Sequence, residues 1–154
     1  MKTADHSRQI ALVGSSEPEQ ELMKLALEIG GFVAQLGAVL ICGGLGGSME
    51  AAARGAKEQG GLTIGILPHY DKETANPFID VVIPTGLGHA RNIIVAASGD
   101  IVIALPGSHG TRSEISVALE LNKPVIGVKA WGDIPGVRQV DTPQELWKAL
   151  LPYF

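Results

Sequence analysis

Short runs of β-branched and other aliphatic residues recur along the whole chain and alternate with stretches of helical periodicity. The clearest runs are five or six residues long and lie at 9–13, 38–42, 62–67, 100–105 and 124–128. Shorter candidates lie at 79–83 and 137–140. Strands of this length between helices imply β-α-β units, in which helices cover both faces of a parallel sheet. The sequence therefore predicts an α/β fold, a Rossmann-like doubly wound parallel sheet.

Helices are expected between these strands, and two of them have start signals. Ser16 followed by Glu19 fits a capping box, with Pro18 in the first turn. A second signal predicts Thr142 as N-cap, Pro143 as the first helical residue and Glu145 as the reciprocal partner. The remaining helices are expected at about 48–59, 88–98 and 111–122.

Length and composition fit one globular domain spanning residues 1–154. The chain has 45% apolar and 18% charged residues, which excludes disorder. Its formal net charge of −4 disfavours nucleic acid as a partner, because nucleic-acid binding needs dense positive charge. A single cysteine, Cys42, excludes an internal disulfide framework and is expected in the core. With four scattered histidines, no metal site is predicted.

Membrane and export signals are not recognised in the sequence. The first residues lack an apolar segment behind a basic start, so no signal peptide is predicted. Residues 29–49 carry no charge, but their many glycines fit a helix end, a buried strand and a loop better than a membrane span. The sequence thus predicts no membrane association and a cytoplasmic protein.

Three loops after predicted strands are rich in glycine and serine, and each is expected to lead into a helix. They are Gly14-Ser15-Ser16, Gly43-Gly44-Leu45-Gly46-Gly47-Ser48 and Gly107-Ser108-His109-Gly110-Thr111. Free amides and the positive dipole end of a helix suit an anion, and glycine lets the backbone approach a phosphate closely. Each loop alone could be a tight turn. Three at one sheet edge favour a small ligand with a phosphate group.

The motifs of several common nucleotide-binding and hydrolase sites are absent from the sequence. The chain has no G-x-x-x-x-G-K-[ST] phosphate loop and no G-x-G-x-x-G after its first strand. No acidic residue ends the second strand to hold a ribose diol, and no G-x-S-x-G nucleophile elbow is present. P-loop ATPases, ordinary NAD enzymes and serine hydrolases are therefore disfavoured.

The segment Leu105-Pro-Gly-Ser-His-Gly-Thr-Arg-Ser-Glu114 resembles the P-G-G-x-G-T-x-x-E signature of the LOG, or lysine-decarboxylase-like, superfamily. The glycine run at 43–49 and the loop at 14–16 are similar to two further family motifs, so the resemblance spans roughly residues 9–130. The family includes phosphoribohydrolases that activate cytokinins. DNA-uptake relatives of the superfamily are disfavoured by the acidic charge balance.

Within that superfamily the segment Pro84-Thr-Gly-Leu-Gly-His-Ala-Arg-Asn92 is most similar to the shorter branch of molybdenum cofactor carrier proteins. Two departures separate the chain from the hydrolases: Asn92 follows the arginine in place of lysine, and Ser108 replaces the signature's second glycine. The resemblance therefore implies a binding protein that holds the molybdenum cofactor, molybdopterin, through its pterin phosphate. The alternative is a LOG-type enzyme that cleaves nucleoside 5′-monophosphates to base and ribose 5-phosphate.

Arg91 and Glu114 are the residues that the resemblance assigns to catalysis if the hydrolase alternative holds. Cleavage of an N-glycosidic bond builds positive charge on the ribose, which a carboxylate stabilises, while an arginine holds the leaving base or the phosphate. Structural roles remain open for both residues: Thr111 with Glu114 fits a capping box, and Arg91 fits a solvated helix position. The predicted binding residues are the following: Gly14, Ser15, Ser16, Gly43, Gly44, Gly46, Gly47, Ser48, Arg91, Asn92, Gly107, Ser108, His109, Gly110, Thr111 and Glu114.

The rest of the sequence adds weaker expectations. Arg112 and His109 flank the predicted anion loop and could contact a phosphate or an oxometal group. Trp131 and Trp147 are expected to be packing or subunit-contact residues. The resemblance implies a homodimer or homotetramer, and the run 93–97 is apolar on more than one helix face, which suits a subunit contact or burial within one chain.

Overall fold

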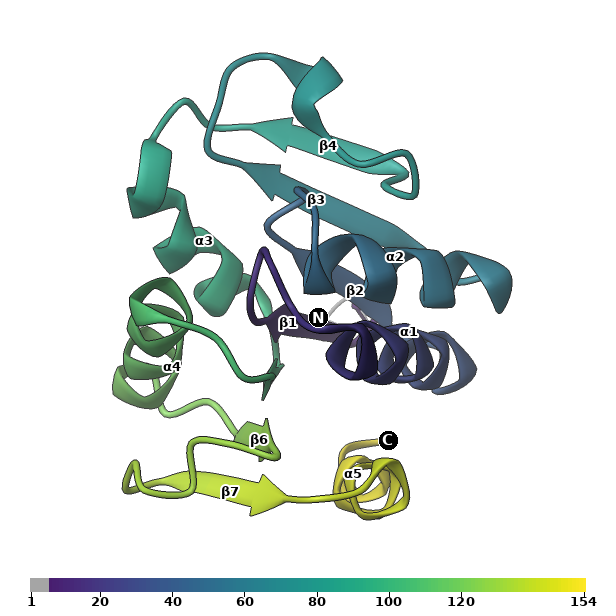
Figure 1. Ribbon diagram of the computed structural model, residues 1–154, viewed down its shortest axis with the longest axis vertical. Coiled ribbons are helices and arrows are strands. Elements are labelled where there is room, and N and C mark those ends of the chain that lie inside the picture. Colours follow the sequence, from purple (N-terminus) through teal and green to yellow (C-terminus); the bar gives the residue numbers. More distant parts are fainter. Residues whose placement is uncertain (1–5) are drawn as a thin grey trace, which may run out of the picture.

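The computed structural model of the chain describes residues 6–154, which form one seven-stranded sheet with helices on both faces (Figure 1). The strands lie in the order β4-β3-β2-β1-β5-β6-β7, and each neighbouring pair is parallel. Their bounds are β1 Gln9–Val13, β2 Val39–Cys42, β3 Thr63–Leu67, β4 Val81–Pro84, β5 Ile101–Ala104, β6 Val125–Val128 and β7 Val137–Val140. The Rossmann-like doubly wound α/β fold is therefore confirmed.

The helices divide between the two faces of the sheet (Figure 1). One face packs against α1 (Gln20–Gln35), α2 (Ser48–Glu58) and α5 (Pro143–Leu150). The other packs against α3 (Arg91–Ser98) and α4 (His109–Glu120). Single 3₁₀ turns lie at Lys72–Thr74, Gly88–Ala90 and Leu151–Tyr153. The chain enters the sheet at its central strand, β1, and builds one side before it returns to β5.

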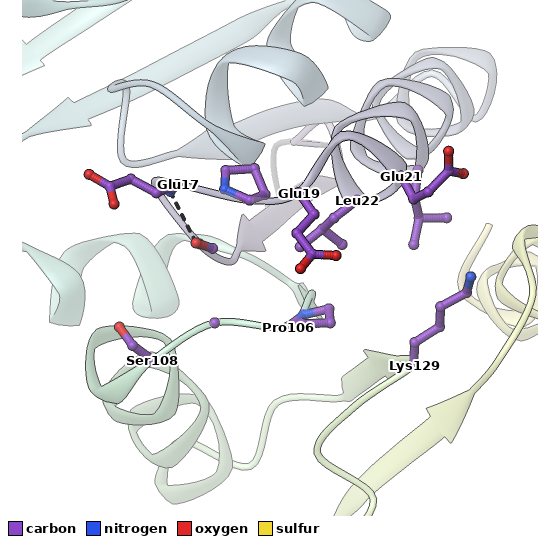
Figure 2. Close-up of a pocket in the computed structure, with 11 residues that line it drawn as sticks. Glu17, Glu19, Glu21, Leu22, Pro106, Ser108 and Lys129 are labelled. Carbon is purple, nitrogen blue, oxygen red and sulfur yellow. Dashed lines mark hydrogen bonds between the residues drawn. The ribbon is translucent and has the colours of Figure 1, made fainter.

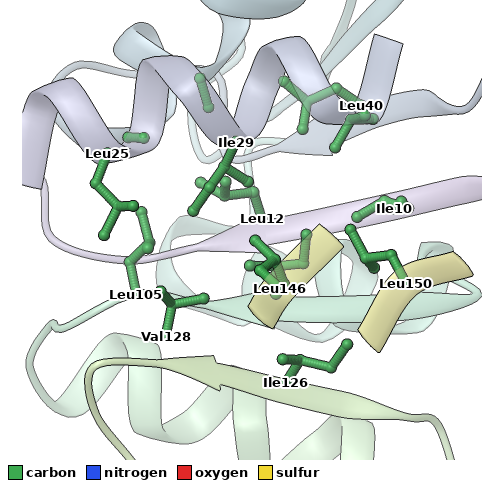
Figure 3. Close-up of a cluster of buried hydrophobic side chains, with 14 of the residues drawn as sticks. Ile10, Leu12, Leu25, Ile29, Leu40, Leu105, Ile126, Val128, Leu146 and Leu150 are labelled. Carbon is green, nitrogen blue, oxygen red and sulfur yellow. The ribbon is translucent and has the colours of Figure 1, made fainter. Parts of the chain in front are cut away.

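Alternation along the central strands creates two separate apolar cores. Ile10 and Leu12 of β1 face α1 and α5, where they join Leu146 and Leu150 in the cluster shown in Figure 3. The neighbouring side chains of β1, Ala11 and Val13, pack on the opposite face. Because each β-strand residue points away from the next, both faces of the sheet are dry, as a parallel sheet requires.

Helices α1 and α2 touch through their backbones at two glycines. A Cβ on Gly30 would overlap the carbonyl oxygen of Ala52, and a Cβ on Gly55 would overlap that of Leu27. Any side chain at either position would force the helices apart. These glycines therefore belong to the packing of the fold, and the pair α1–α2 forms a close unit that supports the loops after β1 and β2.

The three predicted capping patterns have different outcomes. Helix α1 begins at Gln20, and Glu19 is its N-cap without a side-chain cap bond, so the predicted box of Ser16 and Glu19 is wrong. The competing local bond is that of Ser15, whose Oγ accepts from the Glu17 amide at 3.0 Å. Thr142 is confirmed as an N-cap, because its Oγ1 accepts from the Glu145 amide at 3.2 Å.

The other two features of the predicted capping boxes are displaced along the chain from their expected positions. The Glu145 carboxylate accepts from the amide of Asp141, one residue before the cap. Helix α4 begins at His109 with Ser108 as N-cap, so Thr111 and Glu114 do not form a capping box.

Within residues 6–154 no helix is long and apolar enough to cross a membrane.

Candidate functional site

A cavity of about 490 Å³ lies at the carboxyl ends of β1 and β5, the two strands between which the strand order of the sheet reverses. Adjacent strands whose connections leave in opposite directions create a crevice at this point in doubly wound sheets. Most of the predicted binding residues line it: Gly14, Ser15, Ser16, Gly43, Arg91, Asn92, Ser108, His109, Gly110, Thr111 and Glu114. Sequence reasoning missed other lining residues, namely Leu12, Val13, Met49, His89 and Ser113.

The N-terminus of α4 faces this cavity. Its first-turn residues His109, Gly110 and Thr111 line the cavity, and the amides of a helix's first turn have no partner within the helix. The N-cap Ser108 makes no side-chain cap bond. A Cβ on Gly107 would overlap the Thr111 hydroxyl, so the loop lies directly against that side chain. This arrangement presents N–H donors and a positive dipole end to an anion.

Arg91 is the first residue of α3, and its side chain is 9% exposed. Its Nη1 donates to the carbonyl oxygens of Gly43 at 2.6 Å and of Ile66 at 2.7 Å, which ties together the ends of β2 and β3. A Cβ on Gly43 would overlap this guanidinium, which explains the glycine there. Within the described chain the Arg91 Nε has no hydrogen-bond partner. The interpretation of Arg91 as a solvated helix residue is therefore wrong.

Glu114 lies on α4 with 8% of its surface exposed. Burial raises the pKa of its carboxyl from 4.5 to about 8, and the nearby positive charge of Arg91 acts in the opposite direction. The same burial lowers the pKa of Arg91, which Glu114 partly offsets. Among residues 6–154 no ion pair joins the two side chains. Glu114 is thus mostly protonated at pH 7 and can donate a hydrogen bond into the cavity.

In the loop after β2, Gly43 lines the cavity, and most of the other loop residues do not. The Ser48 amide donates to the carbonyl of Ser15 at 3.0 Å, so the first turn of α2 already binds protein at that point. Gly47 has a φ of 68°, and a Cβ there would overlap the carbonyl of Ser16. The residues of the predicted set that do not line the cavity are Gly44, Gly46, Gly47, Ser48 and Gly107.

Asn76 holds the same loop from outside, a role for which no sequence motif provides a signal. Its Nδ2 donates to the carbonyl of Leu45 at 2.9 Å, and its backbone amide donates to that of Gly44 at 2.9 Å. The loop is therefore fixed on both sides. The hydroxyl of Ser48 is buried, and within residues 6–154 it has no hydrogen-bond partner.

The other residues that the sequence singled out pack against other parts of the protein. The Arg112 guanidinium lies over the Trp131 ring, 5.3 Å from its centroid, and the Trp131 Nε1 donates to the Leu105 carbonyl at 2.9 Å. Trp147 packs edge-on against Phe32. Cys42 is buried in the core as expected, and burial raises the pKa of its thiol to about 11. Across residues 6–154 no group of three or more metal-ligating side chains comes together.

A second cavity, of about 530 Å³, lies beside the first on the side of α1 (Figure 2). It shares Ser15 and Ser108 with the first cavity. Its other lining residues include Glu19, Leu22 and Lys129, none of which was predicted as a site residue. Nothing in the sequence around Lys129 resembles a binding motif, so only the folded chain reveals this cavity.

The parallel sheet and the cavity at its switch point define an α/β protein with a Rossmann-like ligand cavity. The chain belongs to the SLOG cluster4 family, whose profile matches residues 7–150. The expected membership of the LOG-like superfamily is thereby confirmed.

Curated relatives include an uncharacterized protein of Archaeoglobus fulgidus, 45% identical over 137 residues, which cover 89% of this chain and 90% of that protein. The cytokinin riboside 5′-monophosphate phosphoribohydrolase of Mycobacterium tuberculosis is 34% identical over 80% of this chain and 71% of its own length.

Solved structures with the same fold include the molybdenum cofactor binding protein of Rippkaea orientalis. It has a TM-score of 0.88 and 34% identity, with 96% of this chain and 99% of that chain covered. The molybdenum cofactor carrier protein of Chlamydomonas reinhardtii has a TM-score of 0.87 and 30% identity over 96% and 98% of the two chains. The chain is thus similar both to molybdenum cofactor binding or carrier proteins and to a phosphoribohydrolase.

Proposed function

We propose that this chain is a binding protein of the molybdenum cofactor carrier type, which holds the pterin phosphate of molybdopterin in the 490 Å³ cavity. The single observation that favours binding is that the first turn of α4 and the buried carboxyl of Glu114 line the same cavity. First-turn amides attract a phosphate. A neutral carboxyl beside them donates a hydrogen bond and does not repel the anion.

The residues present fit the phosphate end of such a cargo. The volume lies within the usual range of small-ligand sites, and the lining combines the apolar Leu12, Val13 and Met49 with polar groups at the α4 N-terminus. The residues proposed to bind are those of the α4 N-terminus, together with Asn92 and His89 of the neighbouring α3 and the turn before it. The molybdenum is cargo held by the pterin, because the chain supplies no metal-ligating cluster within residues 6–154.

The chemistry of the pair Arg91 and Glu114 argues against rapid hydrolysis. A ribosyl cation needs an ionised carboxylate, whereas the pKa of Glu114 is about 8. One guanidinium nitrogen of Arg91 is already used by two backbone carbonyls. Both side chains are therefore better suited to shape the cavity and to bind an anion than to stabilise charge that develops in a reaction.

A second candidate is a LOG-type phosphoribohydrolase that takes an AMP-like substrate. Two observations favour it: Arg91 and Glu114 line the same cavity, and the mycobacterial relative bears the name of such an enzyme. Substrate phosphate could sit at α4 as in the carrier, with the ribose near Glu114. The two functions therefore use one anion site and differ in whether a bond is broken.

An AMP hydrolysis assay separates the candidates. Adenine release is followed with purified protein and with the variants Arg91→Ala and Glu114→Ala. We expect no turnover above that of the variants, together with competition between molybdopterin and AMP for binding. Rapid adenine release that either substitution abolishes would establish the hydrolase and overturn the carrier proposal.

We also propose that the chain forms a homodimer or homotetramer through the outer face of α3. Ile93 is 55% exposed and Ile94 37%, whereas Val95 and Ala96 point into the core. Isolated apolar residues on a surface are common, but Ile93 and Ile94 are adjacent in the chain and both exposed. Sedimentation of an Ile93→Glu variant tests this interface, and an oligomer of unchanged size would refute it.

A further inference from the structure

The second cavity adjoins the proposed anion cavity. Ser15 and Ser108 line both, and the Ser15 amide donates to the carbonyl of Pro106 at 3.2 Å, which joins the two loops between them. Helix α1 lies on one face of the sheet and α4 on the other (Figure 1). A ligand at the switch point can therefore extend from the α4 side to the α1 side over these loops.

The walls of the second cavity suit a flat ring. Leu22 of α1 lies on one side and Pro106 on the other (Figure 2), and Leu25 of α1 also lines the cavity. Apolar walls this close to polar groups are typical of sites that bind heterocycles. The volume of about 530 Å³ is ample for a bicyclic ring.

Two opposite charges face this space from different elements. Figure 2 shows the Glu19 carboxylate directed from the start of α1 toward Pro106, with Lys129 on the opposite wall. Glu19 is the N-cap of α1, yet its side chain makes no cap bond. Among the described residues neither Glu19 nor Lys129 has an ion-pair partner. Both side chains are thus available to a ligand.

Charge distribution orients the ligand. Glu17 and Glu21 add negative charge at the rim of the second cavity, and their carboxylates project away from its interior in Figure 2. A phosphate is repelled there and attracted to the α4 N-terminus. The acidic rim, with Glu19 inside it, therefore favours an uncharged group that bears N–H donors in the second cavity.

We propose that the second cavity binds a 2-amino-4-oxopyrimidine ring, the edge shared by pterins and guanine, and that Glu19 selects it. Such a ring presents two parallel N–H donors, which match the two oxygens of a carboxylate. Adenine offers one donor beside an acceptor nitrogen, whose lone pair would face the carboxylate. The Lys129 ammonium donates to the remaining ring acceptors. This inference rests on the proposed anion site for the phosphate end of the same ligand.

Calorimetric titration of the full chain with separate probes tests the assignment. Ribose 5-phosphate reports the anion cavity alone, while guanosine, adenosine and free pterin report the second cavity alone. GMP and AMP report both. We expect GMP to bind at least tenfold more tightly than AMP, and guanosine and pterin more tightly than adenosine. The stronger of pterin and guanosine identifies the natural source of the ring.

Three variants sharpen the test. Glu19→Gln is expected to weaken GMP and pterin binding about tenfold or more without changing ribose 5-phosphate binding. Lys129→Met is expected to weaken the same probes less. Glu28→Gln on the exposed side of α1 does not line the cavity and serves as the matched control.

Failure of the two proposals looks different. Equal affinities for GMP and AMP, or an unchanged GMP affinity in Glu19→Gln, would overturn the ring assignment while ribose 5-phosphate binding keeps the anion site. Failure to bind ribose 5-phosphate would remove the anion site, whereas the preference for guanosine over adenosine would still decide the ring assignment.

Discussion

The two longest glycine-rich loops look alike in sequence and differ in what they contact. The loop at 107–111 opens onto the cavity with the first turn of α4. Most of the loop at 43–48 does not line the cavity and contacts protein instead: Ser15 and Ser16 of the β1 loop, Arg91 of α3 and Asn76. Glycine allows close backbone packing in the loop at 43–48, whereas the loop at 107–111 borders the open cavity. A glycine-rich loop therefore indicates close approach, and the approaching group can be the protein itself.

The largest expected effect is that of Gly47→Ala. Its positive φ is strained for alanine, and the new Cβ would overlap the carbonyl of Ser16. We expect the free energy of unfolding to fall by about 3 kcal/mol or more, measured by urea denaturation. Gly46→Ala is the matched control, because the nearest atom to its Cβ is the Glu50 Oε2 at 3.9 Å. Equal losses in both variants would contradict the packing role of Gly47.

The next effect tests Arg91 as the clamp on the same loop. Arg91→Met keeps most of the side-chain volume and leaves the carbonyls of Gly43 and Ile66 without their donor. We expect a loss of about 3 kcal/mol in the free energy of unfolding. Arg54→Met removes an exposed pair with Glu58 and should cost about 0.5 kcal/mol. A stable Arg91→Met protein would show that the guanidinium serves the ligand alone.

The third effect is a pH dependence of stability, which is expected if Glu114 is a buried neutral carboxyl and not an ionised one. Its pKa of about 8 in the fold lies above its ordinary value of 4.5, so the folded state holds the proton more tightly than the unfolded chain. Stability from this group is present below pH 4.5 and is lost as the pH rises through 8.

Glu114→Gln removes this ionisation. We expect the variant to exceed the wild type in the free energy of unfolding by about 2 kcal/mol at pH 9, with the difference vanishing toward pH 4. Chemical denaturation across this range measures it. Glu120→Gln, on the exposed side of α4, should show no such trend, and a flat profile for Glu114→Gln would contradict the buried neutral carboxyl.

The smallest effect on stability is expected in the loop that faces the cavity. The Cβ of Gly110→Ala would lie 3.7 Å from the Asn92 Nδ2, an ordinary contact. We expect unfolding to change by no more than about 0.5 kcal/mol, while ribose 5-phosphate binding weakens because the methyl group enters the cavity. An unfolded Gly110→Ala protein would contradict the proposed difference between the two loops, because Gly110 would then be needed for packing as Gly47 is.

The fold was predictable because short apolar runs alternate with helical stretches along the whole chain. Strands such as Ile101–Ala104 are buried on both faces and have little choice of structure. Helix starts were less predictable. The patterns at Ser16 and Thr111 match a capping box, but a turn bond from Ser15 and the N-cap at Ser108 place both helix starts elsewhere.

The candidate site was predictable where motif residues are adjacent along the chain, as at 107–111. Residues brought in by the fold were missed. Lys129 follows β6 and meets the start of α1 only because β6 lies beside β5 in the sheet. The burial of Arg91 likewise depends on two carbonyls, 48 and 25 residues away along the chain. Local spacing carries no information about such contacts.

The central position of β1 has a consequence for how the chain folds during its synthesis. One edge of β1 pairs with β2, but the other must wait for β5, and the bond from the Gln9 amide to Asp100 spans 91 residues. At about 5–20 residues per second, ribosomes take several seconds or longer to cover that distance. Throughout that time the first strand made has an open edge able to pair with another chain. The cavity at the switch point, which needs both strands, forms only after that gap closes.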